Sequence, residues 1–227
     1  MNARLRPTRH CERLRQKISL LLPELEHASQ RLVTHANVRD LYPDYLAMMH
    51  GVIRASVPLM QAAVDRSRAI GENDPVATLL ADYLAKHIPE ELHHDVWLLE
   101  DLEALGKERS IVLARRPAPT VAAVVGAQYY WIFHYHPVAV LGYIGLLEGY
   151  PPTNALMDEL MARTGYGAEA FRTMRAHAAL DPGHREEFEE VLDGLPLTPE
   201  QSAVIGLSAM YTVHTMARAI DEVVGDA

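Results

Sequence analysis

Apolar side chains recur at three- and four-residue spacing along almost the whole chain, which is the pattern of amphipathic helices. No segment shows the sustained alternation of apolar and polar residues that a half-buried strand needs. Clusters of glycine and proline separate the periodic segments and set their ends. The sequence predicts an all-α helical bundle, with helices over residues 9–35, 41–70, 75–105, 119–134, 137–149, 152–164, 168–180, 183–194 and 198–223.

Length and composition are those of a globular chain with one well-developed core. With 227 residues, 49% of them hydrophobic and 22% charged, the chain fits a single domain spanning residues 1–227. The first 17 residues carry six basic side chains against one acid. Because serine is not enriched there, a frayed basic lead-in over residues 1–10 is favoured over a transit peptide.

Charge and cysteine content exclude several classes of protein. The net charge of −9 disfavours nucleic-acid binding, which depends on cationic contacts to phosphate. One cysteine, Cys11, provides neither a disulfide framework nor a cysteine-rich zinc site. The longest apolar run, residues 137–147, is too short to cross a membrane and ends at Glu148. We therefore expect a cytoplasmic protein that acts on a small molecule, and the sequence leaves a homodimer open.

The most specific cluster of polar residues is the pattern H-x-x-x-D-x-x-H, formed by His177, Asp181 and His184. On a continuous helix the three side chains share one face, and imidazole combined with carboxylate suits iron or manganese. Pro182 and Gly183 interrupt the pattern, and proline disfavours helical geometry in the residue before it. The alternative is therefore that Asp181 caps a new helix whose first residue is Pro182.

A second candidate site lies in the segment HIPEELHHDVWLLEDLEAL. Within it, His87, Glu91 and His94 share one helix face at spacings i, i+4 and i+7. Glu90 and His93 repeat the E-x-x-H spacing one residue earlier, and this spacing alone is common on solvated helix surfaces. We prefer the later pair, because the apolar stripe continues on the side of His94 with Trp97, Leu98 and Leu102.

Glu148 is a lone carboxylate at the end of the apolar segment LGYIGLLEG. A buried carboxylate is costly unless a cation, a metal or a proton neutralises it. The alternative is that Glu148 ends its helix at Gly149 and turns toward solvent. If a metal site forms, we expect Glu148 to converge with His94 and His177.

Taken in order, E-x-x-H, a glutamate in an LLEG segment and H-x-x-x-D-x-x-H resemble the ligand segments of the haem-oxygenase-like dimetal oxidases and oxygenases. The resemblance covers about residues 80–190. It implies a haem-oxygenase-like bundle of about seven main helices that binds two Fe(II) ions, with manganese as the alternative, and uses O2 as co-substrate. Members of this family oxidise small acids by C–C cleavage or amines by N-oxygenation. The metal ligands implied are Glu91, His94, Glu148, His177, Asp181 and His184.

Other classes of protein leave part of this pattern unexplained. A ferritin-like di-iron bundle would use Glu24 and His27 and leave the 177–184 triplet idle. A haem-dependent oxidase would need a histidine on an early helix, such as His27 or His35. A thiaminase of related fold would need a nucleophilic cysteine deeper in the fold than Cys11. A cofactorless oxidase on the same fold needs no metal, and a metal-free helical binding protein is the non-enzymatic alternative.

The aromatic and polar residues around these motifs are expected to line a pocket or to face solvent rather than to bind a metal. We expect Tyr143, Trp97 and the aromatic run at 129–135 to form the walls of a substrate pocket. His134 and His136 alternate just before a proline, so packing or a pocket wall is favoured over ligation. The exposed face of the 75–105 helix is expected to carry Asp95, Glu100, Asp101 and Glu103.

Overall fold

The computed structural model describes residues 9–225, apart from the side chains of residues 180–182. This part of the chain forms helices and turns but no strand, so the all-α prediction is confirmed. Seven of the described helices have 15 residues or more, in agreement with the expected seven main helices. The α-helices are α1 (His10–Thr34), α2 (Val38–Ile53), α3 (Ser56–Ile70), α4 (Pro75–Glu91), α5 (His94–Ala104), α6 (Arg109–Ala114), α7 (Pro119–His134), α8 (Val140–Leu147), α9 (Asn154–Thr164), α10 (Arg172–Gly194) and α11 (Pro199–Val224). Short 3-10 turns precede α8 and α10 at Pro137–Ala139 and Ala168–Phe171.

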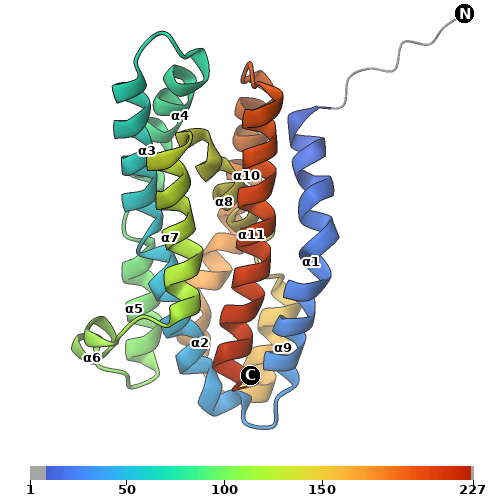
Figure 1. Cartoon of the computed structure of the whole chain (residues 1–227). Helices are drawn as coiled ribbons and strands as arrows, with labels where there is room; N and C mark the ends of the chain where they lie inside the picture. Colours follow the sequence, from blue (N-terminus) through green and yellow to red (C-terminus); the bar gives the residue numbers. More distant parts are fainter. Residues whose placement is uncertain (1–8, 226–227) are drawn as a thin grey trace, which may run out of the picture.

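The long helices lie side by side in a bundle, with α11 running along its middle and α1 along one side (Figure 1). Helix α11 packs against α1, α7 and α8, and α3 packs against α4. Fully buried apolar side chains from different helices form the core, among them Leu46, Leu80, Ile132, Leu141 and Val213. None of the helices between residues 9 and 225 combines the length and the apolar character that a bilayer crossing requires.

Helix α8 approaches α11 very closely at Gly142. A Cβ atom at this position would collide with the backbone oxygen of Ile205 and with the backbone nitrogen of Ala209. Only glycine therefore allows the two backbones to come this near. Because Glu148 follows the last residue of α8, the contact also fixes where this carboxylate lies.

The predicted helix 41–70 is divided into α2 and α3 at Arg54 and Ala55. Pro58 consequently falls in the first turn of α3, where its missing N–H costs no hydrogen bond. Helix α6 was not predicted at all. It has six residues, none of them fully buried, and is too short for a helical periodicity to reveal.

The predicted helix 75–105 is also divided, because Leu92 is extended and His93 is left-handed with φ of 74°. His93 is the one non-glycine residue with a positive φ in the described part of the chain. Such a conformation is strained and persists only where the surrounding packing requires it. The expectation that His87, Glu91 and His94 lie on one continuous helix was therefore wrong, since the chain breaks between the last two.

Helix α10 continues through Pro182 and Gly183, so the predicted break between residues 180 and 183 was wrong. Proline removes one hydrogen bond from the helix, but tertiary packing supplies most of a helix's stability. Met174 before the proline and Phe188 after it are both buried in the bundle. Their packing holds the two halves of α10 in line.

Asp101 was expected in solvent, but it is fully buried. Its Oδ2 accepts the backbone N–H of Thr173 at 2.9 Å, in the first turn of α10. The first N–H groups of a helix have no partner within that helix, so an acceptor from α5 satisfies one of them. Asp101 thereby attaches the start of α10 to α5.

Asp74 caps the start of α4, and its replacement by alanine is expected to lower the free energy of unfolding by about 1 kcal/mol. Its carboxylate accepts the N–H groups of Val76 at 2.9 Å and Ala77 at 3.0 Å, and lies 3.0 Å from His136 Nε2. Burial alone would raise the pKa of Asp74, but these hydrogen bonds outweigh it and lower the pKa below 3.8. Urea unfolding at pH 7 measures the loss.

Because the pKa of Asp74 is lowered in the folded state, its contribution is complete above the ordinary value of 3.8 and is lost as the pH falls through the folded value. The difference between wild type and Asp74→Ala should therefore shrink in strong acid. Asp82→Ala, at an exposed position of the same helix, is the control and should change stability by less than about 0.5 kcal/mol. A pH-independent difference would contradict this account.

Candidate metal centre

Two groups of ligand atoms lie inside the bundle, and both include Glu91. One consists of Glu91, His94 and His177, and the other of His87, Glu91 and Glu148. In each group the nitrogen and oxygen atoms lie within 4.8 Å of one another. Residues far apart in sequence, on α4, α5, α10 and at the end of α8, are thus brought together by the fold.

The break between α4 and α5 determines how Glu91 and His94 meet. Glu91 is the last residue of α4 and His94 the first of α5, and His94 Nδ1 lies 3.0 Å from Glu91 Oε2. His94 is 2% exposed, and its ring packs on Trp97 with centroids 4.2 Å apart. Burial alone would raise the pKa of Glu91, but the hydrogen bond from His94 and nearby histidine charges lower it. The carboxylate is therefore kept ionised at neutral pH.

His177 on α10 is oriented by the backbone of its own helix. Its Nδ1 lies 2.9 Å from the carbonyl oxygen of Thr173, to which it donates, and this leaves the lone pair of Nε2 free for a metal. Asp101 holds Thr173 from α5, so the orientation of His177 is supported by two helices. Burial lowers the pKa of His177 and favours the neutral ring that metal ligation needs.

His87 and Glu148 form a buried pair in the second group. His87 Nε2 lies 2.8 Å from Glu148 Oε1, whereas Oε2 has no hydrogen-bond partner among the described residues. Burial raises the pKa of Glu148 more than the hydrogen bond from His87 lowers it. Burial would lower the pKa of His87, but the hydrogen bond and charge of Glu148 raise it to about 9. The pair therefore keeps a proton, and one carboxylate oxygen is left for a cation to satisfy.

His184 lies beside both groups without belonging to either. Its Nδ1 has no hydrogen-bond partner in the described part of the chain and is 3.6 Å from Glu91 Oε1. Its ring centroid is 5.3 Å from that of His87. The side chain of Asp181, the remaining predicted ligand, lies outside the described residues. Of the six predicted ligands, four thus belong to the two groups and His184 adjoins them.

His87 was not among the predicted ligands, although the structure places it in the second group. The signal was present, since His87 lies one turn before Glu91 and shares its helix face. Spacing alone does not distinguish a histidine that binds a metal from one that binds a carboxylate ligand. That difference depends on Glu148, which is 61 residues away in the sequence.

A largely apolar cavity adjoins both groups. Its empty volume is about 820 Å³, including the part that opens to solvent, and Glu91, Glu148 and His177 are among the residues that line it. Tyr143 lines it too, with its hydroxyl 2.9 Å from Ser56 Oγ. No lysine or arginine is among the residues that line this cavity. The apolar lining comes mainly from Leu46, Met49, Ile53, Leu98, Ile144 and Leu147.

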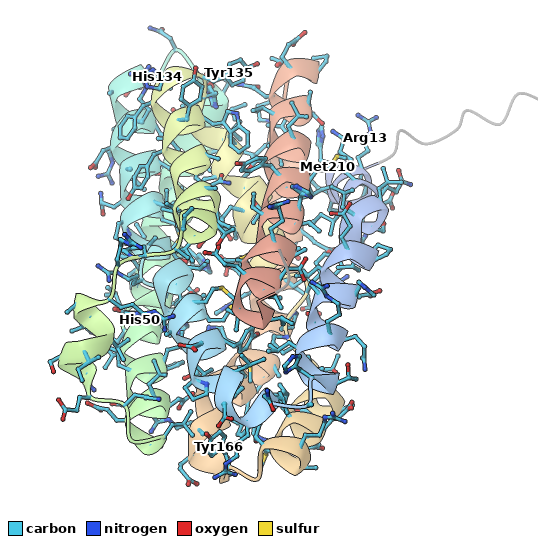
Figure 2. All side chains as sticks on the ribbon, turned by 60° about the horizontal axis from the view of Figure 1, so that its bottom comes forward. Arg13, His50, His134, Tyr135, Tyr166 and Met210 are labelled. Carbon is cyan, nitrogen blue, oxygen red and sulfur yellow. The ribbon has the colours of Figure 1, made fainter. Side chains whose placement is uncertain are left out.

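The other expected pocket walls lie elsewhere. Trp97 packs against His94 and is not among the cavity-lining residues. No residue of the aromatic run at 129–135 lines this cavity either, and Tyr130 and Phe133 are 64% and 51% exposed. The expectation that this run forms a wall of the pocket was therefore wrong. The histidines at its end, His134 and His136, belong to neither group of ligand atoms. Figure 2 shows His134 beside Tyr135 at one end of the bundle, and His136 binds Asp74.

Residues that rival interpretations require are not suitably placed. His27 is exposed on α1, and His35 Nδ1 accepts the backbone N–H of Asn37 at 3.1 Å. Glu24 pairs with the surface residue His214 rather than with an interior site. The thiol of Cys11 is buried and bonded to a carboxylate of α10, and burial raises its pKa. A thiolate nucleophile is therefore disfavoured at this position.

Comparison with known proteins identifies the fold and the family of this chain. A crystal structure of a domain of unknown function with a heme oxygenase-like fold from Shewanella denitrificans OS217 matches with a TM-score of 0.79 and 19% identity, over 93% of this chain and 90% of that chain. The crystal structure of a TenA homolog from Pseudomonas syringae pv. tomato str. DC3000 matches with a TM-score of 0.65 and 16% identity, over 91% and 92%. At these identities both structures establish only that the fold is haem-oxygenase-like. No curated protein matches the sequence. The model of the family described as iron-containing redox enzyme matches residues 43–214, about three quarters of the chain, and the protein therefore belongs to this family.

Proposed function

We propose that the protein is a non-haem di-iron oxidase or oxygenase that uses O2 to oxidise a small organic acid or amine. The sharing of Glu91 by two groups of ligand atoms is the observation that supports this most, because one carboxylate can bridge two metal ions. Mixed imidazole and carboxylate donors suit iron, with manganese as the alternative. The unpartnered Oε2 of Glu148 and Nδ1 of His184 fit the same pair of ions.

In this proposal Glu91 belongs to both metal positions. His94 and His177 complete one position, and Glu148 with the α10 residues Asp181 and His184 completes the other. His87 either joins the second position or holds the carboxylate of Glu148 in place. Two ferrous ions held by these residues would supply electrons for the reduction of O2. The fold sets the positions of the ligands. The carbonyl of Thr173 orients His177, and the close contact of Gly142 with α11 fixes α8, which Glu148 directly follows.

The adjoining cavity supports a substrate with an apolar part. Apolar side chains dominate its lining, as is usual for a site that binds an apolar group. Because no lysine or arginine lines it, the carboxylate of an acid has no side-chain cation to bind and would have to reach the metal ions. An amine could instead approach the carboxylates of Glu91 and Glu148. C–C cleavage and N-oxygenation are therefore both included in the proposal.

Anaerobic titration with ferrous ion is expected to load two iron ions per chain, and the loaded protein should consume O2 faster than free ferrous ion does. His177→Ala should lose most of this uptake, because it removes a ligand whose geometry the fold has fixed. His214→Ala removes an exposed histidine that pairs only with Glu24, and it should behave as wild type. Iron content and an oxygen electrode measure both quantities. Equal O2 uptake in the two variants would remove the proposed centre from consideration.

A further inference from the structure

A second cavity lies on the opposite side of α2 from the metal centre. Its empty volume is about 1230 Å³, including the part that opens to solvent, and it shares no lining residue with the first cavity. Its walls come from α2, from α6 and the segment that follows it, from the start of α7 and from the end of α11. Apolar side chains cover much of this surface, among them Met48, Val112, Val121, Val125 and Val223.

One buried polar atom in this cavity has no partner within the described residues. His50 is 2% exposed and lines the cavity, and its Nε2 makes no hydrogen bond. Figure 2 shows His50 on α2, beside the part of the chain that carries α6. Burial and then the charge of Arg54 lower the pKa of His50 more than the charge of Asp95 raises it, so its ring is neutral at neutral pH. A neutral imidazole protonated on Nε2 has one hydrogen bond to donate, and this donor is not used within the described residues.

The charges around the cavity favour an anion. Asp44 is neutralised by Arg115, whose guanidinium lies 2.6 Å from its carboxylate. Glu222 accepts a hydrogen bond from a threonine hydroxyl of α7. Arg54 and Arg116 also line the cavity, and neither forms an ion pair with a described residue. The hydrogen bond leaves the charge of Glu222 in place, so the charged residues of the described lining carry one excess positive charge. Together with the buried donor of His50, this would suit one negative charge.

We propose that this cavity binds a small organic carboxylate with an apolar body, with its carboxylate between His50 and the two free arginines. The apolar walls argue against a free phosphate, which is strongly hydrated and would leave them uncovered. A monocarboxylate carries the single charge that this arrangement balances, and its body covers the apolar surface. The proposal concerns a site separate from the metal centre and does not depend on iron chemistry.

Benzoate and benzamide are suitable probes because they have nearly the same shape and differ in charge. In calorimetric titrations of the full chain, benzoate is expected to bind at least about tenfold more tightly than benzamide. His50→Leu should weaken benzoate binding about tenfold, and Arg54→Gln should weaken it several-fold, with little effect on benzamide. Arg68→Gln removes a like charge from an exposed position on α3 and is the matched control, with unchanged affinity. Arg54 is itself exposed, so Arg54→Gln keeps the test valid if His50→Leu folds poorly.

The metal-site cavity is the competing location for the same probe. His177→Ala, which changes only that cavity, should leave benzoate affinity as in wild type. If His177→Ala weakens binding while Arg54→Gln and His50→Leu do not, benzoate occupies the metal-site cavity and the inference is overturned. Equal affinities for benzoate and benzamide, or no binding of either at millimolar concentration, overturn it as well. These measurements need no iron, so their failure would leave the proposed oxidase function standing.

Discussion

Glu91→Ala is expected to abolish iron binding at both positions at once, because its carboxylate is the one ligand common to the two groups. Even residues that only orient a ligand typically change metal affinity about 10–100-fold, so the loss of a shared ligand should exceed this. Glu148→Ala, in contrast, removes a member of one group and should leave the Glu91, His94 and His177 group able to bind. Iron per chain, measured after anaerobic loading and desalting, should be near zero in the first variant and about half of the wild-type value in the second.

Asp82→Ala is the matched control for Glu91→Ala. Asp82 is an exposed carboxylate on the same helix, α4, and belongs to neither group. Its replacement should leave the iron content close to that of wild type. If Glu91→Ala and Glu148→Ala each lose the same single ion, Glu91 is not shared and the two-metal interpretation is wrong.

Gly142→Ala is expected to destabilise the fold by about 1–3 kcal/mol, although alanine is the better helix former. The added methyl group would meet backbone atoms of Ile205 and Ala209, which cannot rotate away as a side chain can. Helix α8 must therefore move away from α11 and carry Glu148 with it. We expect a lower midpoint in urea unfolding, together with weaker iron binding in the group that contains Glu148.

Gly126→Ala provides the comparison for this effect. Gly126 is also inside a helix, α7, but a Cβ there would meet nothing within 4 Å. The same substitution should stabilise the protein by about 0.5–1 kcal/mol, as is usual for glycine to alanine in an open helical position. If both variants gain stability, the close approach of α8 to α11 does not constrain the fold.

Apolar periodicity, together with the glycine and proline signals at the ends, predicted the helices that have one buried face. Helix α7 extends over the predicted residues 119–134, and α1 and α11 differ from prediction by one residue at each end. The breaks at Arg54 and at His93 were missed, because each follows from how neighbouring helices pack rather than from local sequence. The opposite error occurred at Pro182, where a local rule favoured a break and packing on both sides of the proline preserved the helix.

Helical spacing predicted those site residues that lie close together on one segment of the chain, but not the contacts between segments. The residue types and their order indicated Glu91, His94 and His177, which the structure places in one group. The role of His87 could not be predicted, since its partner Glu148 comes from another helix. The aromatic run at 129–135 was misjudged because composition does not reveal which face of the bundle a helix presents.

Helix α2 separates the two cavities and contributes side chains to both. Tyr45, Met49 and Ile53 face the cavity beside the metal centre, while Met48 and His50 face the other. A molecule that displaces α2 on one side therefore reshapes the space on the other side. Thermodynamic linkage then makes the effect reciprocal. If a ligand in one cavity changes the affinity of the second cavity for its ligand by some factor, a ligand in the second changes the affinity of the first by the same factor.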